Sequence, residues 1–270
     1  MQFVQEQIMS AWQPDQYLLF EKERTRPAID LVNRMEFESP KRIIDIGCGP
    51  GNSTSVLRAR WPNAHIIGLD NSQSMIDKAK ASHPEGEWLL MDANEDFSSL
   101  GSFDIAFSNA ALQWIPSHEK LLPNLYRQLS HGGLIAVQVP FVRHLPVFNE
   151  IIAMTRSSRW ASCFASLPEY PKHYPFRHYY DIICRLSQEI YIWQTDYLHV
   201  MSSHDDIVDW YKGTGLRVFL DLLPDDQARR NFCSEYSERI AKAYPIEKDG
   251  NVILPFTRIF FLVYKRSSAS

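Results

Sequence analysis

The stretch from Arg42 to Arg60 constrains the fold of this chain more than any other. An apolar, β-branched run leads into the turn Asp-Ile-Gly-Cys-Gly-Pro-Gly at 45–51, and a helical pattern follows from Ser53. A strand, a glycine-rich turn and a helix in this order bring the backbone close to a ligand at a helix N-terminus. The spacing is G-x-G-x-G, and Asn52 stands where a dinucleotide-binding loop has its third glycine. Asp45 would repel a pyrophosphate, so the turn favours a ligand that carries positive charge.

Length and composition narrow the class of protein. A chain of 270 residues forms one large α/β domain or one domain with a cap. Hydrophobic residues make up 45% of it and aromatic residues 13%, which is enough to fill a sizeable core. The net charge of -4 argues against a surface that coats nucleic acid. An anionic substrate would therefore have to be held by locally clustered Arg and His side chains.

Four scattered cysteines, with no C-x-x-C pair, indicate a reduced protein rather than a disulfide scaffold or a metal site. Residues 1–12 lack a basic region followed by an apolar run, so no signal peptide is expected. No apolar run approaches the length of a membrane span. We therefore expect a cytoplasmic protein with no metal, no nucleic-acid partner and no membrane partner.

Strand-like and helix-like segments alternate from residue 41 to residue 140. Helices are expected at 53–61 and after Ser72, which is a plausible N-cap. The turn His131-Gly132-Gly133 separates the last helix-like piece from the last strand of this half. Such alternation predicts a parallel sheet with helices on both faces. The predicted strands are 43–46, 64–69, 87–91, 103–108 and 134–139.

The remainder of the chain does not show this regular alternation of strands and helices. Residues 1–40 are expected to form N-terminal helices, with Pro27 in the first turn of the second. Segments 141–180 and 203–249 are expected to be insertions, the second largely helical with Ser203 and Asp225 as N-caps. Long strands are predicted at 190–201 and 252–264. Because no repeat and no linker is evident, the chain 1–270 is expected to be a single domain with its cofactor-binding half at 41–140.

Acidic residues follow the second and third predicted strands. Asp70, 25 residues after Asp45, closes the second strand, where a carboxylate can accept hydrogen bonds from both hydroxyls of a ribose. Asp92 follows the third strand, and the segment Ser-Asn-Ala-Ala-Leu-Gln-Trp at 108–114 follows the fourth. Each acid could instead be a turn or N-cap residue. Because parallel strands end at the same edge of a sheet, we expect these side chains to surround one ligand.

This combination resembles motif I and its neighbours in class I S-adenosylmethionine-dependent methyltransferases. The resemblance implies an α/β, Rossmann-like sheet, mostly parallel with the last strand antiparallel, and helical insertions that form a cap. It implies S-adenosyl-L-methionine as the cofactor, with Asp70 at the ribose and Asp92 near the adenine amino group. A dehydrogenase, the rival with a similar fold, would need a later third glycine and a hydride-handling set, and neither is found. The cofactor-binding residues expected are Asp45, Gly47, Cys48, Gly49, Gly51, Asn52, Asp70, Asn71, Met75, Asp92, Ala93, Asn109 and Ala110.

A closer resemblance extends over nearly the whole chain and includes segments outside the cofactor half. The matching segments are 12–17, Phe20, 23–28, 47–54, 109–114, 179–181, 193–201, 203–204, 209–210, 214–217 and Arg258. Together they resemble the trans-aconitate 2-methyltransferase family, which implies methyl transfer to one carboxylate of a small polycarboxylic acid. Residues 141–177 diverge most from the family's pattern, which bears on the choice of acceptor.

A tricarboxylic acceptor would leave two carboxylates unreacted, and Arg side chains hold such groups best because their guanidinium binds them bidentately. Each candidate also has an ordinary explanation, since a lone Arg on a helix is usually solvated and Arg217 could be a helix-end cation. Tyr179 and Tyr180 are adjacent on a helix, so at most one can reach the pocket. The substrate-positioning candidates are Tyr17, Arg24, Arg26, Trp114, Arg177, His178, Tyr180, His199 and Arg217.

Other acceptors in the same fold remain open. They are a different small acid, an acyl group on a carrier protein, or a carbon or nitrogen nucleophile. A carrier-bound substrate would need a basic patch at the pocket mouth, and a carbon nucleophile would need a buried base such as His178, His199 or Glu23. A protein that binds S-adenosylmethionine without turnover is a remote alternative from a different functional class. The sequence does not decide the oligomeric state.

Overall fold

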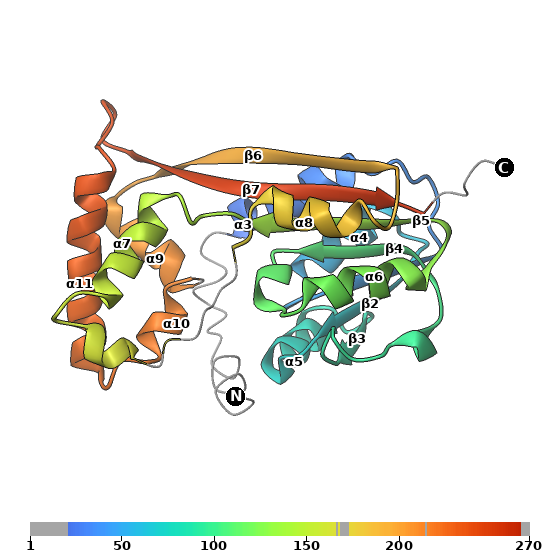
Figure 1. Ribbon diagram of the computed structural model, residues 1–270, viewed down its shortest axis with the longest axis horizontal. Coiled ribbons are helices and arrows are strands. Elements are labelled where there is room, and N and C mark those ends of the chain that lie inside the picture. The colour runs from blue at the N-terminus through green and yellow to red at the C-terminus, as the bar shows by residue number, and fades with distance from the viewer. Residues whose placement is uncertain (1–20, 166, 168–172, 214, 266–270) are drawn as a thin grey trace. The chain divides into compact units, whose positions relative to one another are not determined.

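The computed structural model describes residues 21–165, 167, 173–213 and 215–265. Within them a seven-stranded sheet has the order β3-β2-β1-β4-β5-β7-β6 (Figure 1). Neighbouring strands from β3 to β5 run parallel, and β7 pairs antiparallel with β5. The predicted mostly parallel sheet with an antiparallel last strand is confirmed. The strands are β1 (Arg42–Ile46), β2 (His65–Asp70), β3 (Glu87–Leu90), β4 (Phe103–Asn109), β5 (Leu129–Pro140), β6 (Ile190–Met201) and β7 (Val252–Tyr264).

The chain divides into two compact units. The first, here called the sheet unit, comprises Lys22–Pro140, Tyr174–Thr195 and Arg258–Ser270. The second, here called the helical unit, comprises Met1–Glu21, Phe141–His173 and Asp196–Thr257. By residue number, β6 and β7 contribute to both units. The expected site residues at strand ends all belong to the sheet unit.

Right-handed crossovers decide which helices cover which face of the sheet. The connections through α4 and α5 lead from β1 outward to β3, whereas α6 leads from β4 to β5 in the opposite direction, so α6 covers the other face. Tyr179 of α8 stacks on His118 of α6 and packs against Phe261, so α8 shares that second face (Figure 1). The sheet unit's helices are α3 (Glu21–Asn33), α4 (Asn52–Arg60), α5 (Gln73–Ser82), α6 (His118–Gln128) and α8 (Phe176–Ile183), with short 3-10 turns η1 (Ser98–Leu100) and η2 (Leu112–Trp114).

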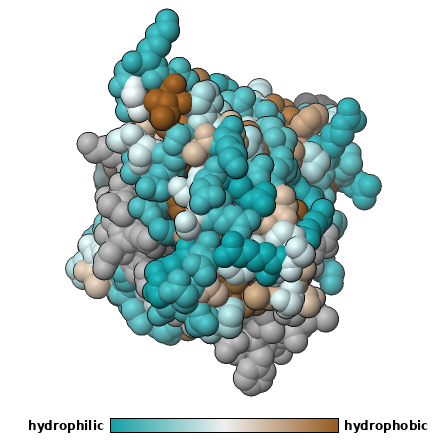
Figure 2. Space-filling model, turned by 90° about the vertical axis from the view of Figure 1, so that its left-hand side faces the viewer, coloured by the Kyte–Doolittle hydropathy of each residue, from teal (hydrophilic) through white to brown (hydrophobic). Residues whose placement is uncertain are grey.

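The helical unit is built around α11 (Asp226–Ala243). Phe232, Tyr236 and Ile240 recur at the spacing of one helix face and are fully buried, while the Tyr236 hydroxyl donates to the carbonyl of Val147 at 2.8 Å. The face of the protein in Figure 2 is largely hydrophilic, as expected for the outer side of such an amphipathic helix. The other elements of the helical unit are α7 (Pro146–Thr155), η3 (Ala161–Phe164), α9 (His204–Lys212) and α10 (Arg217–Leu220).

Local sequence signals predicted most element boundaries. Ser203 and Asp225 are N-caps whose side chains accept the backbone N–H of Asp206 and Ala228 at 3.2 and 2.8 Å. Ser72 is the N-cap of α5, although its side chain makes no capping hydrogen bond.

Among the described residues, no helix is both long and apolar enough to cross a membrane.

Two local predictions were wrong. Pro27 lies inside α3 rather than in the first turn of a helix. The expected turn at 131–133 is part of β5, where the register with β4 shifts between Phe103 and Ile105 and Gly132 has a φ of 81°. The glycines therefore form an irregularity within a continuous strand.

Candidate active site

Asp45 lies at the carboxyl end of β1 and is completely buried. Its Oδ2 accepts hydrogen bonds from Ser53 Oγ at 2.7 Å and Thr54 Oγ1 at 2.6 Å, both in the first turn of α4. Its Oδ1 is buried without a hydrogen-bond partner among the described residues. Burial raises the pKa of Asp45 to about 6, and the charge of Asp70 acts in the same direction. The site therefore contains a carboxyl group that a cationic ligand would stabilise in its ionised form.

The glycine-rich loop uses its own N–H groups within the protein. Gly47 and Cys48 both donate to the carbonyl of Leu69, at 2.7 and 3.0 Å, and Gly51 donates to the carbonyl of Cys48. The Gly49 N–H donates to Asp70 Oδ2 at 2.9 Å. Because these donors already have protein acceptors, the loop does not form the N–H nest that holds a pyrophosphate. This arrangement separates it from a dinucleotide-binding loop.

Position 47 requires glycine because the backbone there passes close to Ala111. It has a φ of 71°, and a Cβ there would lie 2.2 Å from Ala111 Cβ. We expect Gly47→Ala to destabilise the protein by about 2–4 kcal/mol, because overpacking adds to left-handed backbone strain. Urea unfolding measures the change, and Gly49→Ala is the matched control. Gly49 also has positive φ, 55°, but a Cβ there meets nothing within 4 Å. Equal losses in the two variants would exclude the contact with Ala111 as the cause.

Asp70 closes β2 and connects the loop to α5. Its Oδ2 accepts the Gly49 N–H and its Oδ1 accepts the Ser72 N–H at 2.9 Å, so both oxygens are fixed in position. Burial raises the pKa of this carboxyl, while the backbone N–H groups oppose the shift. Each carboxylate oxygen retains capacity for a second hydrogen bond. This geometry suits a carboxylate that binds two adjacent hydroxyls.

The remaining predicted cofactor residues lie on the same edge of the sheet unit or support it. Asp92 follows β3, and its Oδ1 accepts both the backbone N–H and the side-chain N–H of Asn94, at 2.8 and 2.9 Å. Asn71 is exposed, whereas Met75 and Ala93 are buried. Cys48 packs with Ile76, Ala79 and Trp88, and burial raises the pKa of its thiol. Its side chain is therefore part of the core, and only its backbone can face a ligand.

The end of β4 carries a strained backbone. Ala110 has a φ of 54°, which is uncommon for a residue with a side chain, and its N–H donates to the carbonyl of Gln138 at 2.9 Å. Gln113 Nε2 donates to the Ala110 carbonyl at 2.6 Å. Asn109 Oδ1 is buried with no hydrogen-bond partner in the part of the chain that the structure describes. Such strain and unpaired polar atoms cluster at functional sites.

Sequence reasoning missed a buried polar pair beside Asn109. Arg258 of β7 is 5% exposed and Gln138 of β5 is fully buried, and Arg258 Nη1 donates to Gln138 Oε1 at 3.2 Å. Each polar side chain stands in a largely apolar stretch of its strand, and this exception to the pattern is the signal that could have identified them. Arg258 was noted only as one position of the family resemblance.

The substrate-positioning candidates belong to several different elements. Tyr17 lies outside the described residues, and so does the side chain of Arg24. Arg26, Arg177 and Tyr180 are exposed, and Trp114 is half-buried in η2. His178 lies on α8, with its Nε2 3.2 Å from His118 Nδ1.

Two candidates belong to the helical unit. His199 is buried against the ring of Trp210, with centroids 4.7 Å apart. Arg217 pairs with Asp221 at 3.5 Å, one turn along its own helix. The substrate-positioning roles of all these residues remain predictions.

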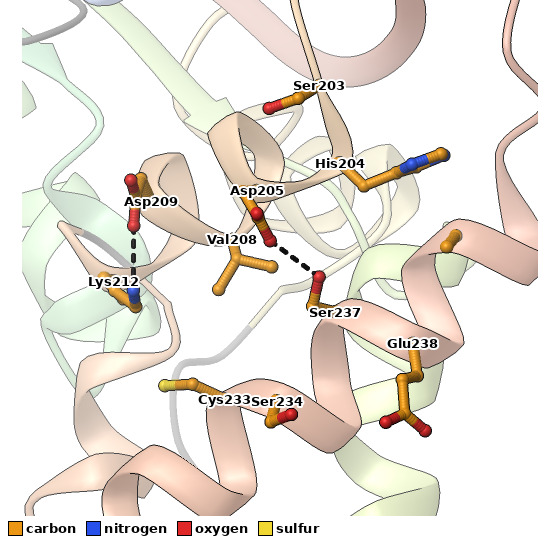
Figure 3. Close-up of a pocket in the computed structure, with 11 residues that line it drawn as sticks. Ser203, His204, Asp205, Val208, Asp209, Lys212, Cys233, Ser234, Ser237 and Glu238 are labelled. Carbon is orange, nitrogen blue, oxygen red and sulfur yellow. Dashed lines mark hydrogen bonds and ion pairs between the residues drawn. The ribbon is translucent and has the colours of Figure 1, made fainter.

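A groove in the helical unit lies between α9 and α11 (Figure 3). Its volume is about 700 Å³, and its charged lining residues are mostly acidic, including Asp205, Asp209 and Glu238. Lys212 donates to Asp209 at 2.8 Å and Ser237 donates to Asp205 at 2.8 Å, so these polar groups are paired with each other (Figure 3). An acidic groove with paired side chains does not suit an anionic ligand.

Comparison with known proteins agrees with the fold. The methyltransferase domain family matches residues 44–137. The solved structure of phosphoethanolamine N-methyltransferase 2 from Haemonchus contortus, 18% identical, superposes with a TM-score of 0.54 over 90% of this chain and 53% of that one. Strand order, glycine-rich loop and acids at strand ends together define a class I S-adenosylmethionine-dependent methyltransferase, as the sequence predicted.

Relatives of similar length specify the family. A trans-aconitate 2-methyltransferase from Methylobacterium radiotolerans is 40% identical, and one from Variovorax paradoxus is 36% identical. Each alignment covers 96% of this chain and 100% of the relative. The chain belongs to the trans-aconitate 2-methyltransferase family.

Proposed function

We propose that this enzyme transfers the methyl group of S-adenosylmethionine to one carboxylate of trans-aconitate and forms a monomethyl ester. The observation that supports the acceptor most directly is the full-length identity of 36–40% to relatives with that name. Buried donor groups of Gln138, near the end of β5, and of Arg258, which is paired with Pro140 in the middle of β7, also suit a polyanion. The small carboxylic acid is therefore the acceptor class that sequence and chemistry favour together.

The residues present fit the methyl donor. Asp45 Oδ1, buried without a hydrogen-bond partner within the described part of the chain, suits the ammonium group, and Asp70 suits the ribose hydroxyls. Asp92 suits the adenine amino group because its Oδ2 is not used in the turn with Asn94. The open space at Gly49 allows the backbone to approach a ligand closely. S-adenosylmethionine would supply a methyl group on a sulfonium, which needs no further activation.

The acceptor also needs little chemical help from the chain. A carboxylate is ionised near pH 7, so no side chain has to remove a proton from it. The contribution of the protein is then to orient the acceptor, to exclude water and to hold the carboxylates that do not react. Orientation of this kind contributes up to about 7–11 kcal/mol when the reacting atoms are held near attack geometry. This explains how a site without a strong base can be catalytic.

A tritiated-methyl assay tests the proposal. We expect base-labile labelled product from trans-aconitate, because a methyl ester hydrolyses in alkali whereas N-methyl and C-methyl products do not. Fumarate, citrate and a long-chain acyl carrier protein serve as comparison acceptors in the same assay. Label in a base-stable product, or product only from the carrier-bound acid, would overturn the proposed acceptor while leaving the fold and class unchanged.

A further inference from the structure

The pair Arg258–Gln138 occupies a position next to the predicted methyl-donor site. Gln138 is opposite Asn109 in the β4–β5 register, and Arg258 is opposite Pro140 in the β5–β7 register. Asn109 is two residues beyond Phe107, which pairs with Asp45. Residues in register share a face, and so do residues two apart in a strand. Asp45, Asn109, Gln138 and Arg258 therefore lie on one face of the sheet, near the carboxyl ends of β1, β4 and β5.

Arg258 fixes the orientation of the Gln138 amide. A guanidinium only donates hydrogen bonds, so the atom of Gln138 that faces it at 3.2 Å must be the carbonyl oxygen. The amide NH₂ group then points elsewhere, and Nε2 is fully buried with no hydrogen-bond partner among the described residues. A buried donor without an acceptor is unfavourable in the ligand-free protein. The orientation thus leaves an N–H donor available to a ligand.

The chemistry of this pair is that of an anion site. The guanidinium of Arg258 carries a positive charge and five N–H donors with no acceptor, and in this orientation the Gln138 amide directs its NH₂ group away from the guanidinium. Planar carboxylates match such donors well. Burial at 5% and 0% exposure would strengthen the attraction, because solvent screens it little.

We propose that Arg258 and Gln138 bind a carboxylate of the acceptor that is not methylated, so that they position the reacting carboxylate. This inference rests on the proposed function, because it assigns a role within methyl transfer to a polycarboxylic acid. It makes the two residues determinants of specificity: acids without the second carboxylate lose the anchor. Asn109, opposite Gln138 at the end of β4, marks the boundary between this anchor and the donor site.

The test is calorimetry of acceptor binding to the complex with S-adenosylhomocysteine, together with turnover. Gln138→Glu keeps an oxygen for Arg258 and replaces the NH₂ donor by a carboxylate oxygen. We expect it to weaken trans-aconitate binding by about 10- to 100-fold, because a charge-assisted hydrogen bond is replaced by repulsion. Arg258→Lys, which keeps the charge but removes the planar fork, should raise KM for trans-aconitate more than it lowers kcat.

The dicarboxylates that each lack one carboxylate of trans-aconitate complete the design. For the dicarboxylate that lacks the anchored carboxylate, the affinities of Gln138→Glu and of the wild-type protein should agree within about threefold. Affinity for S-adenosylhomocysteine, unchanged within the same factor, shows that each variant is folded. A parallel loss of S-adenosylhomocysteine affinity in both variants would indicate a structural role and overturn the anchor.

Failure of the anchor and failure of the proposed function give different results. If wild type esterifies trans-aconitate and both variants bind it as tightly as wild type does, the anchor is wrong and the proposed function stands. If the wild-type protein neither binds nor esterifies any of these acids, both the proposed function and the proposed anchor are wrong.

Discussion

Replacing Asp45 by asparagine should stabilise the ligand-free protein at pH 7.5 by about 3 kcal/mol and weaken its binding of S-adenosylhomocysteine. Burial raises the pKa of Asp45 from 3.8 to about 6, and each unit corresponds to about 1.4 kcal/mol. Asparagine keeps an oxygen for Ser53 and Thr54 without a buried charge. The same change removes the carboxylate expected to face the ammonium of the ligand. Stability and binding should therefore change in opposite directions.

The pH dependence of this effect has a definite sign. Because the pKa is raised in the folded state, the native protein binds more protons than the unfolded chain between pH 3.8 and about 6. Wild type should lose stability as pH rises through this window and change little from this group above it. Urea unfolding of wild type and Asp45→Asn at pH 4 and pH 7.5 measures the difference, which should be small at pH 4 and largest at pH 7.5.

Asp104→Asn is the matched control, because its pKa is shifted in the opposite direction. Ser130 and the N–H groups of Lys41 and Arg42 hydrogen-bond the Asp104 carboxylate and lower its pKa, although desolvation opposes them. This variant should be destabilised at pH 7.5 and approach wild type as the pH falls below 4. A pH-independent effect of Asp45→Asn would show that this carboxyl is not protonated in the folded protein and would contradict the mechanism.

Ligand binding should respond to the same proton. An ammonium near Asp45 favours the ionised carboxylate, so binding releases a proton below pH 6. The affinity of wild type for S-adenosylhomocysteine should then rise by up to about tenfold per unit between pH 5 and 6, whereas Asp45→Asn should lack this slope. Calorimetry in buffers of different ionisation enthalpy counts the released protons directly.

The parts of the fold that the sequence predicted are those specified by local chemistry. Consecutive β-branched residues predict β1 and β2, and the side chains of Ser203 and Asp225 identify helix starts because they bond N–H groups three residues away. Pro27 was misplaced because tertiary packing, which buries it, outweighs the preference of proline for a first turn. The glycines at 132 and 133 indicated a break in the chain, yet β5 continues through them because strand pairing on both sides spans the irregularity.

The residues of the candidate site also differ in whether local sequence could predict them. Asp45 and Asp70 were found because each stands at the end of a recognisable strand, where the fold places ligands. The contact between Gln138 and Arg258 joins residues 120 positions apart, and no local pattern encodes which two strands become neighbours. The order β5-β7 is a property of the whole sheet, so the pair could be identified only once that order was known.

Removing the Asp70 side chain should have the largest effect on cofactor binding. We expect Asp70→Ala to lower the affinity for S-adenosylhomocysteine by about 100- to 1,000-fold, since hydrogen bonds to a charged group contribute about 1.5–3 kcal/mol each. Part of the loss is indirect, because Asp70 also holds the Gly49 and Ser72 N–H groups that shape the loop and the start of α5. Calorimetric titration measures the affinity, and urea unfolding measures the cost of the lost loop contacts separately.

Asp96→Ala is the matched control for Asp70→Ala. Asp96 Oδ1 accepts the N–H of Ser98, two residues on, at 2.9 Å, which is the same local turn that Asp70 forms with Ser72. It is exposed, lies in the connection between β3 and β4, and is not among the residues predicted to bind the cofactor. Asp96→Ala should therefore lose the turn hydrogen bond but bind S-adenosylhomocysteine like wild type. Equal affinity in Asp70→Ala and wild type would exclude Asp70 from the ribose site, whereas equal losses in the two variants would attribute the effect to the turn alone.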